Sequence, residues 1–320
     1  MDKQKYTYKK DLKLFGLIRF PVMPAVVPVA QTFLNALYYL NFSSSKMKTE
    51  KIKIPSDKGG LVDAIVFSPS SVSKNSPCLV FYHGGGFAYP GAPHHYSLPK
   101  KMAEVLNIKT VYVNYRLAPK HKFPTAPIDA FSAYKWVVEN SDALKINKNK
   151  IAVMGDSAGG NLATVVCLMA RDNKVQMPCA QVLLYPFVDR KGNSESMKKY
   201  FDAPMVTKKD CEVFNSLYVD SLEGEREEYF SPIDAESLKG LPEAYVEVAE
   251  FDCLKDSAIS YAERLKDFGV ETEVVVVEGA MHGYDIATKS KTVASCIKKR
   301  ADFLKAQFDK AEKRKLVLTK

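Results

Sequence analysis

The 320-residue sequence predicts an α/β fold, with a mostly parallel sheet of eight strands covered by helices on both faces. Two observations lead to this prediction. Short apolar runs recur along the chain, and the central ones are apolar at consecutive positions, which is typical of strands buried on both faces. In the later part of the chain these runs alternate with segments of helical periodicity, as expected when helices connect parallel strands.

The predicted strands lie in eight short runs. They are KIKI from Lys51, LVDAIVF from Leu61, CLVFY from Cys78, TVYVNY from Thr110, KIAVMG from Lys150, QVLLYP from Gln181, AYVEVAE from Ala244 and TEVVVVEG from Thr272. Helical periodicity predicts four helices between and after the later strands, at residues 127–140, 157–171, 256–268 and 290–308. A further surface helix is expected in TFLNALYYLNF, residues 32–42.

Residues 190–230 interrupt this rhythm, because they are polar, charged and aromatic and contain no strong strand. We interpret them as an insertion that forms a lid, or cap, together with residues 1–48. The main α/β domain is then expected to comprise residues 49–189 and 231–312, followed by a basic tail at 313–320.

The N-terminal segment LFGLIRFPVMPAVVPVAQ follows basic residues and shares some features of a signal peptide. Arg19 interrupts its apolar run, and Pro21, Pro24 and Pro28 disfavour a continuous helix. We therefore favour a packed segment over a stable membrane insertion. A signal peptide remains the alternative interpretation.

The net charge of +9 is carried by the two ends of the chain. Residues 1–13 hold five lysines and two aspartates, residues 298–320 hold nine basic and three acidic residues, and residues 14–297 are balanced. This distribution indicates solvated ends rather than a nucleic-acid-binding surface, with a weak contact to an anionic surface as the alternative.

The six cysteines occur singly and lack the spacing of a metal site. Several of them lie in apolar runs, which is typical of buried free thiols in a reducing compartment. We therefore expect a cytoplasmic protein, and a homodimer is a possible assembly.

The strongest chemical signal is MGDSAGGNLA, which follows a predicted strand and opens a predicted helix. Gly155, Ser157 and Gly159 form a G-x-S-x-G pattern. A serine on such a turn is held in a strained conformation above the sheet, beside the free N–H groups of a helix N-terminus. The pattern therefore predicts a serine nucleophile. A glycine-rich turn with a capping serine is the alternative.

A serine hydroxyl needs a base and an orienting acid before it becomes a good nucleophile. Of the five histidines only His282 follows Ser157, which is the expected chain order in a strand–turn–helix arrangement of this kind. Asp252 lies just past a predicted strand and is the preferred acid. Glu250 and Asp256 are close enough in sequence to compete.

The run HGGG at residues 83–86 follows another predicted strand. Its backbone N–H groups, with that of Ala158, suit the stabilisation of an oxyanion, because no side chains obstruct them. A flexible loop is the alternative. His83 is interpreted as a hydrogen-bonding anchor of this loop. His94 and His95 lack a third ligand, so we expect neither a metal nor another cofactor.

Five motifs in order, HGGGF, YRLAPKHKFPTAP, GDSAGGNLA, EFDCLKD and MHG, resemble those of the hormone-sensitive-lipase-like branch of the α/β-hydrolases. The resemblance runs from about residue 50 to 308. It implies a carboxylesterase with a mostly helical cap, built from an N-terminal segment and an insertion before the acid.

The same resemblance implies a role for individual residues. Ser157, Asp252 and His282 correspond to the catalytic triad. The oxyanion donors correspond to Gly85, Gly86 and Ala158, with Gly84 shaping the loop. YRLAP and Asp156 correspond to structural positions. Cys253 departs from the pattern because proline is common there, and we expect it to loosen the acid loop.

The resulting hypothesis is a serine carboxylesterase that acts on small, relatively apolar esters through an acyl-enzyme. One alternative is a catalytically silent receptor for a small molecule, because fold alone does not determine function. An amidase or peptidase that uses the same triad is another.

Overall fold

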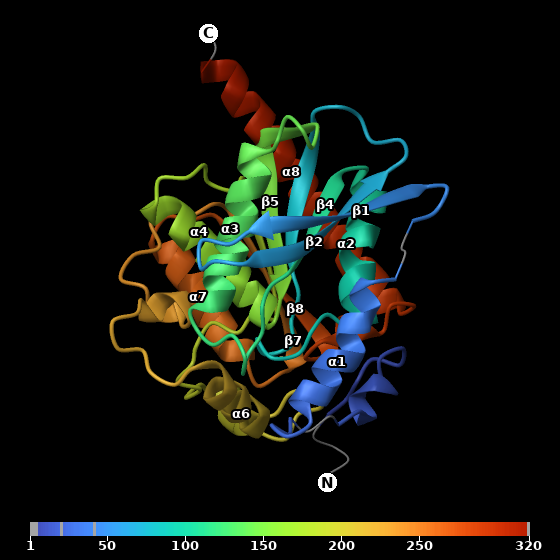
Figure 1. The fold of residues 1–320 in the computed structure, drawn as a ribbon. Coiled ribbons are helices and arrows are strands. Elements are labelled where there is room, and N and C mark those ends of the chain that lie inside the picture. Colours follow the sequence, from blue (N-terminus) through green and yellow to red (C-terminus); the bar gives the residue numbers. More distant parts are fainter. Residues whose placement is uncertain (1–5, 20–21, 41–42, 319–320) are drawn as a thin grey trace.

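The computed structural model describes residues 6–19, 22–40 and 43–318, which contain one eight-stranded sheet in the order β1-β2-β4-β3-β5-β6-β7-β8 (Figure 1). The strands are β1 (Met47–Pro55), β2 (Leu61–Pro69), β3 (Ser76–Tyr82), β4 (Lys109–Asn114), β5 (Ile146–Asp156), β6 (Gln181–Leu184), β7 (Ala244–Phe251) and β8 (Thr272–Met281). Strand β2 is antiparallel to both of its neighbours, and the strands from β4 to β8 pair in parallel. The prediction of a mostly parallel, eight-stranded sheet is confirmed.

Helices cover both faces of this sheet, as Figure 1 shows. One face carries α2 (Pro93–Leu106) and α8 (Lys291–Leu318), and the other carries α3 (Thr125–Glu139), α4 (Ala158–Asp172) and α7 (Lys255–Asp267). Each layer buries its own apolar core against the strands. The four predicted connecting helices correspond to α3, α4, α7 and α8, and their observed starts lie within two residues of the predicted ones.

Helix α2 is absent from the sequence prediction, and its prolines explain the omission. Pro93 lies in the first turn, which proline tolerates, but Pro99 lies inside the helix and removes a backbone donor. Tyr96, Leu98 and Met102 are buried in the core beside the sheet. Their burial offsets the missing hydrogen bond, so tertiary packing overrides the local sequence signal.

The N-terminal segment and residues 190–230 contact each other at one end of the molecule. The first contains η1 (Phe15–Leu17) and α1 (Val27–Tyr38), and the second contains α5 (Glu195–Lys199) and α6 (Lys208–Tyr218). Tyr6 Oη donates to Asp202 Oδ1 at 2.6 Å, and the Val22 N–H donates to Asp210 Oδ1 at 2.9 Å. In Figure 1, α1 and α6 accordingly lie at the same end of the sheet.

Both ends of the chain differ in detail from the prediction. Helix α1 begins five residues before the expected 32–42, and residues 41–42 lie outside the described part. Helix α8 continues to Leu318, into the segment expected to be a tail. Ion pairs of Lys310 with Glu243 (2.6 Å) and of Glu312 with Lys150 (2.5 Å) bind its last turns to the domain. No described helix combines the length and the apolar character that crossing a bilayer requires.

A hydrogen-bonded carboxylate joins the N-terminal segment to the α/β domain. Asp11 accepts hydrogen bonds from Ser290 Oγ (2.6 Å), the Thr292 backbone N–H (2.9 Å) and Thr292 Oγ1 (3.1 Å) at the start of α8. The bond from Ser290, followed by that from the Thr292 backbone, lowers the pKa of Asp11 from 3.8 to about 2. The ionised form is therefore the one that stabilises the fold.

We expect Asp11→Ala to lower the free energy of unfolding at pH 6, measured by urea denaturation, by about 1 kcal/mol or less. The loss is small because water screens this exposed carboxylate. A pKa that is lower in the folded state gives stability that is complete above the unfolded value and is lost as the pH falls toward the folded one. The difference in the free energy of unfolding between the wild type and Asp11→Ala should therefore narrow as the pH falls from about 4 to 2. Asp302→Ala, on the exposed surface of α8, is the matched control. A difference that widens as the pH falls would contradict this account.

Candidate active site

Ser157 lies on the turn between β5 and α4, with a backbone φ of 53° and ψ of −118°. L-residues rarely adopt this conformation, which costs about 1–3 kcal/mol and persists only where the surroundings enforce it. The Ser157 N–H donates to Leu184 O (2.9 Å), and its carbonyl accepts from the Phe187 N–H (3.1 Å). Both bonds come from the segment at and after the end of β6, so the neighbouring strand holds the turn.

Gly159 is required by the tight approach of this turn to β3. A Cβ at this position would overlap with the carbonyl oxygen of Tyr82. The first turn of α4 can therefore lie directly against the end of β3, which also carries the glycine run. The G-x-S-x-G pattern thus reflects a steric requirement as well as a chemical one.

His282 lies between Ser157 and Asp252. Its Nε2 is 2.9 Å from Ser157 Oγ, and its Nδ1 is 2.7 Å from Asp252 Oδ2. The other carboxylate oxygen of Asp252 accepts from the Leu254 N–H at 2.9 Å. Since a carboxylate only accepts, Nδ1 carries the proton and Nε2 is free to accept the serine proton. His282 and Asp252 are both buried, which shields this chain of hydrogen bonds from water.

The other two carboxylates considered as the acid point elsewhere. Glu250 Oε2 accepts from the backbone N–H of Gly279 at 2.7 Å, and Asp256 Oδ2 accepts from the N–H of Ser196 at 2.7 Å. Asp256 thereby joins α7 to the start of α5 in the 190–230 insertion. Of the three carboxylates, Asp252 is the one that meets His282.

Cys253, expected to loosen the acid loop, instead forms contacts with the 190–230 insertion. Its thiol donates to Val206 O at 3.7 Å, and its carbonyl accepts from Ser196 Oγ at 2.8 Å. The hydrogen bond with Cys211, together with burial, raises the pKa of the Cys253 thiol. Cys253 therefore connects the segment that carries Asp252 to the 190–230 insertion.

The glycine run lies beside Ser157 and lines the same cavity. The Gly84 N–H donates to Asp156 Oδ1 at 3.1 Å, and a Cβ on Gly84 would lie 2.5 Å from the other oxygen of that carboxylate. Within the described residues, no acceptor is found for the N–H groups of Gly85, Gly86 and Ala158. Three residues with unpaired backbone N–H groups therefore line the same cavity as Ser157.

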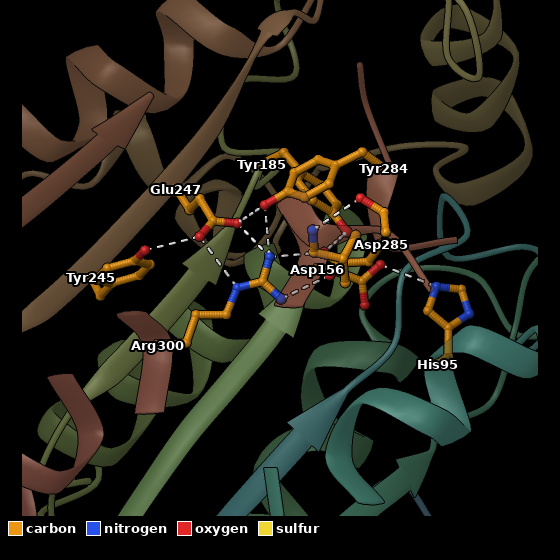
Figure 2. Close-up of polar contacts among 10 residues, drawn as sticks. His95, Asp156, Tyr185, Tyr245, Glu247, Tyr284, Asp285 and Arg300 are labelled. Carbon is orange, nitrogen blue, oxygen red and sulfur yellow. Dashed lines mark hydrogen bonds and ion pairs between the residues drawn. The ribbon is translucent and has the colours of Figure 1, made fainter. Parts of the chain in front are cut away.

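Asp156, which the resemblance assigns to a structural position, joins the glycine run to the serine turn. Its Oδ2 accepts from His95 Nε2 at 3.1 Å (Figure 2), while His95 Nδ1 accepts from the Ala92 N–H at 2.9 Å. Although burial acts in the opposite direction, His95 and its neighbours lower the pKa of Asp156. Asp156 is thus an ionised anchor that binds two loops, and the sequence indicated its structural role but not these contacts.

The remaining histidines lie outside the Ser157–His282–Asp252 chain. His83 is fully buried below the glycine run, with Nδ1 2.7 Å from Gly84 O and its ring stacked on Tyr115. Burial lowers the pKa of His83 and of His94 to about 3, so both are neutral. His121 lines a separate surface pocket. In the described part of the chain, no three His, Cys, Asp or Glu side chains converge as metal ligands.

A cavity of about 190 Å³ opens above Ser157 and His282. It is lined mainly by apolar side chains from the N-terminal segment, the 190–230 insertion and the strand ends. These are Val22, Phe87, Tyr89, Phe187, Met205, Val206, Cys211, Phe214 and Leu254. The site can therefore hold a small apolar group against a hydrogen-bonded serine and three free N–H donors.

A sheet of this topology with a serine on the turn after β5 defines an α/β-hydrolase. The family model described as the alpha/beta hydrolase fold matches residues 79–286. An arylesterase of Saccharolobus solfataricus is 34% identical over 68% of this chain and 71% of its own length. An ethyl acetate hydrolase of Pseudomonas putida is 32% identical over 64% of this chain, and this chain spans 65% of that enzyme.

A solved esterase structure from Pyrobaculum calidifontis has a TM-score of 0.82 and 34% identity to this chain. The superposition covers 92% of this chain and 97% of that one. The chain belongs to the α/β-hydrolase family.

Proposed function

We propose that this protein is a serine carboxylesterase that hydrolyses short-chain, relatively apolar carboxylic esters through an acyl-enzyme. The observation that carries the proposal is the unbroken hydrogen-bond chain from Ser157 Oγ through His282 to Asp252, next to three free backbone donors. The esterases among its relatives support the same class of reaction.

In the proposed mechanism, His282 Nε2 removes the proton of Ser157 Oγ as the oxygen attacks the ester carbonyl. Asp252 holds the imidazole in the required tautomer and stabilises the imidazolium that forms. His282 then protonates the leaving alcohol. A water molecule, deprotonated by the same histidine, then attacks the carbonyl of the acyl-enzyme. The bond between the acyl carbon and Ser157 Oγ breaks, His282 returns the proton to Oγ, and the acid is released.

The oxyanion of each tetrahedral intermediate is stabilised by the N–H groups of Gly85, Gly86 and Ala158. We propose that these donors are oriented before substrate binds, so that no reorganisation is needed as negative charge develops. His83 and Gly84 shape the loop that carries two of them, and Asp156 fixes the loop against the serine turn.

The cavity supports a small acyl group. Its volume of about 190 Å³ lies below the roughly 300–1,000 Å³ of sites for drug-sized ligands. We propose that residues 1–48 and 190–230 form the cap that limits it, over a catalytic domain of residues 49–189 and 231–312. Residues 313–320, expected from the sequence to be a basic tail, continue α8 as far as Leu318.

We propose a cytoplasmic location, which is supported by the six cysteines, none of which forms a disulfide in the described residues. The homodimer considered from the sequence stays a prediction. The alternative of a silent small-molecule receptor is disfavoured, because a receptor has no need for an intact chain from Ser157 to Asp252.

Ser157→Ala should abolish hydrolysis of p-nitrophenyl butyrate while leaving the circular dichroism spectrum unchanged. A serine-directed phosphonate should add one covalent group to the wild type and none to the variant, as measured by intact mass. Labelling at another residue, with the activity of Ser157→Ala retained, would refute the proposed nucleophile.

Asp252→Asn should lower kcat by at least about 100-fold, because the amide favours the wrong tautomer of His282; the same change in a serine protease costs about 10⁴-fold. The matched controls are Glu250→Gln and Asp256→Asn, whose carboxylates bond to backbone N–H groups away from His282. Both controls should change kcat much less. The acid would have to be reassigned if Asp252→Asn stayed within about tenfold of wild type while one control lost its activity.

With p-nitrophenyl esters of increasing acyl length, kcat/KM should be highest for the acetate or butyrate and should fall by the octanoate. Phe214 lines the cavity from α6, so Phe214→Ala should enlarge it and raise the relative rate for longer chains. Phe201→Ala is the control, since its side chain is exposed and does not line the cavity. A wild-type preference for long-chain esters would contradict the proposed small pocket.

A further inference from the structure

A buried cluster of charged residues lies behind the loop that carries His282. Arg300 on α8 is fully buried and donates to Glu247 of β7 and to Asp285 (Figure 2). Its Nη1 and Nη2 each lie 2.9 Å from an oxygen of Asp285, and its Nε lies 3.2 Å from Glu247 Oε2. Nη2 also donates to Tyr284 Oη at 2.9 Å.

Stability alone is a weak explanation for this cluster. Desolvation opposes the burial of an arginine and two carboxylates, and apolar residues of similar volume often stabilise a core equally well. Burial raises the pKa of Asp285, although Arg300 opposes that shift. Such a cluster instead holds its members in one geometry, because each guanidinium N–H has a fixed direction.

Two members of the cluster belong to the His282 loop itself. Tyr284 and Asp285 follow His282 in the short helix η4 (Tyr284–Ile286), and both are bonded to Arg300. The guanidinium therefore holds the loop just after the histidine. Helix α8 is in this way connected to the site although none of its residues lines the cavity.

Tyr185 connects the same cluster to the imidazole ring. Its hydroxyl donates to Asp285 Oδ2 at 2.8 Å, and its ring meets that of His282 edge-on, with centroids 5.0 Å apart. Its backbone has a φ of 35°, and its N–H donates to Glu247 O at 2.5 Å. A fully buried side chain on a strained backbone, fixed at both ends, has little freedom to move.

We infer that Tyr185 is a positioning residue for His282, and that Arg300 fixes Tyr185 through Asp285. The two ring nitrogens of His282 are engaged by Ser157 and Asp252, and the Tyr185 ring restricts rotation of the imidazole about that line. This inference rests on the proposed esterase function. Tyr185 would then hold His282 in position independently of Asp252, which bonds to the same imidazole.

The test compares two equivalent deletions of a hydroxyl group. Tyr185→Phe removes the bond to Asp285 next to His282, and Tyr245→Phe removes the 2.9 Å bond to Glu247 on the far side of the cluster. Both changes remove one buried donor from a carboxylate of the cluster, so both should lower the urea midpoint to a similar extent. The measurement is kcat and KM for p-nitrophenyl butyrate, per active site titrated with the phosphonate.

For Tyr185→Phe we expect kcat to fall about tenfold with KM nearly unchanged, because small displacements of a catalytic group cost rate rather than binding. Tyr245→Phe should stay within about twofold of wild type in both constants. Equal kcat values for the two variants, at equal loss of stability, would overturn the inference. The proposed function would survive that outcome, because it is tested separately by the loss of hydrolysis in Ser157→Ala.

Arg300→Lys provides a second measurement that leaves Tyr185 unchanged. Lysine retains the charge but cannot bond both carboxylates in the fixed geometry of a guanidinium. A lower kcat with a retained KM is expected, again per titrated site. A wild-type kcat in this variant would contradict the positioning role assigned to Arg300. If Tyr185→Phe fails to fold, this variant is the one that tests whether the cluster positions His282.

Discussion

The backbone conformation of Ser157 is the constraint on which the rest of the site depends. A φ of 53° at a non-glycine residue turns the chain sharply from β5 into α4 and exposes the hydroxyl above the sheet. This strain is maintained by hydrogen bonds from the end of β6 and by the direct contact of Gly159 with the end of β3. Relaxation of the turn would move Ser157 Oγ away from His282 and the Ala158 N–H away from the glycine run.

The topology of the sheet brings the other groups to this turn. Strands β3, β5, β6, β7 and β8 are adjacent and parallel, so the segments that follow them meet at one edge. Buried polar contacts then fix these segments in pairs: Asp156 joins the glycine run to the serine turn, and the Arg300 cluster joins α8 and β7 to the His282 loop. Both sets of contacts involve the face of the sheet that carries α2 and α8, because Asp156 is bonded to His95 on α2 and Arg300 lies on α8.

The strands and the connecting helices were predictable because each depends on a local pattern of apolar residues. The residues Ser157, Asp252 and His282 were identifiable because they follow strand ends in a recognisable order. Helix α2 was missed because packing outweighs Pro99. The contacts of Asp156 and Tyr185 were also missed, since they join positions about 70 to 100 residues apart in the chain, and no local pattern encodes them. The short helices α5 and α6 were not predicted, because α5 spans only five residues and many residues of α6 are polar.

The central claim is that the strained serine turn and the glycine run together form a preorganised oxyanion site. A crystal structure of the phosphonyl adduct of Ser157 tests it most directly, because the phosphonyl oxygen mimics the oxyanion. We predict that this oxygen lies about 2.7–3.1 Å from the backbone nitrogens of Gly85, Gly86 and Ala158. An adduct whose oxygen points away from these three groups, with the glycine run in its present position, would contradict the account.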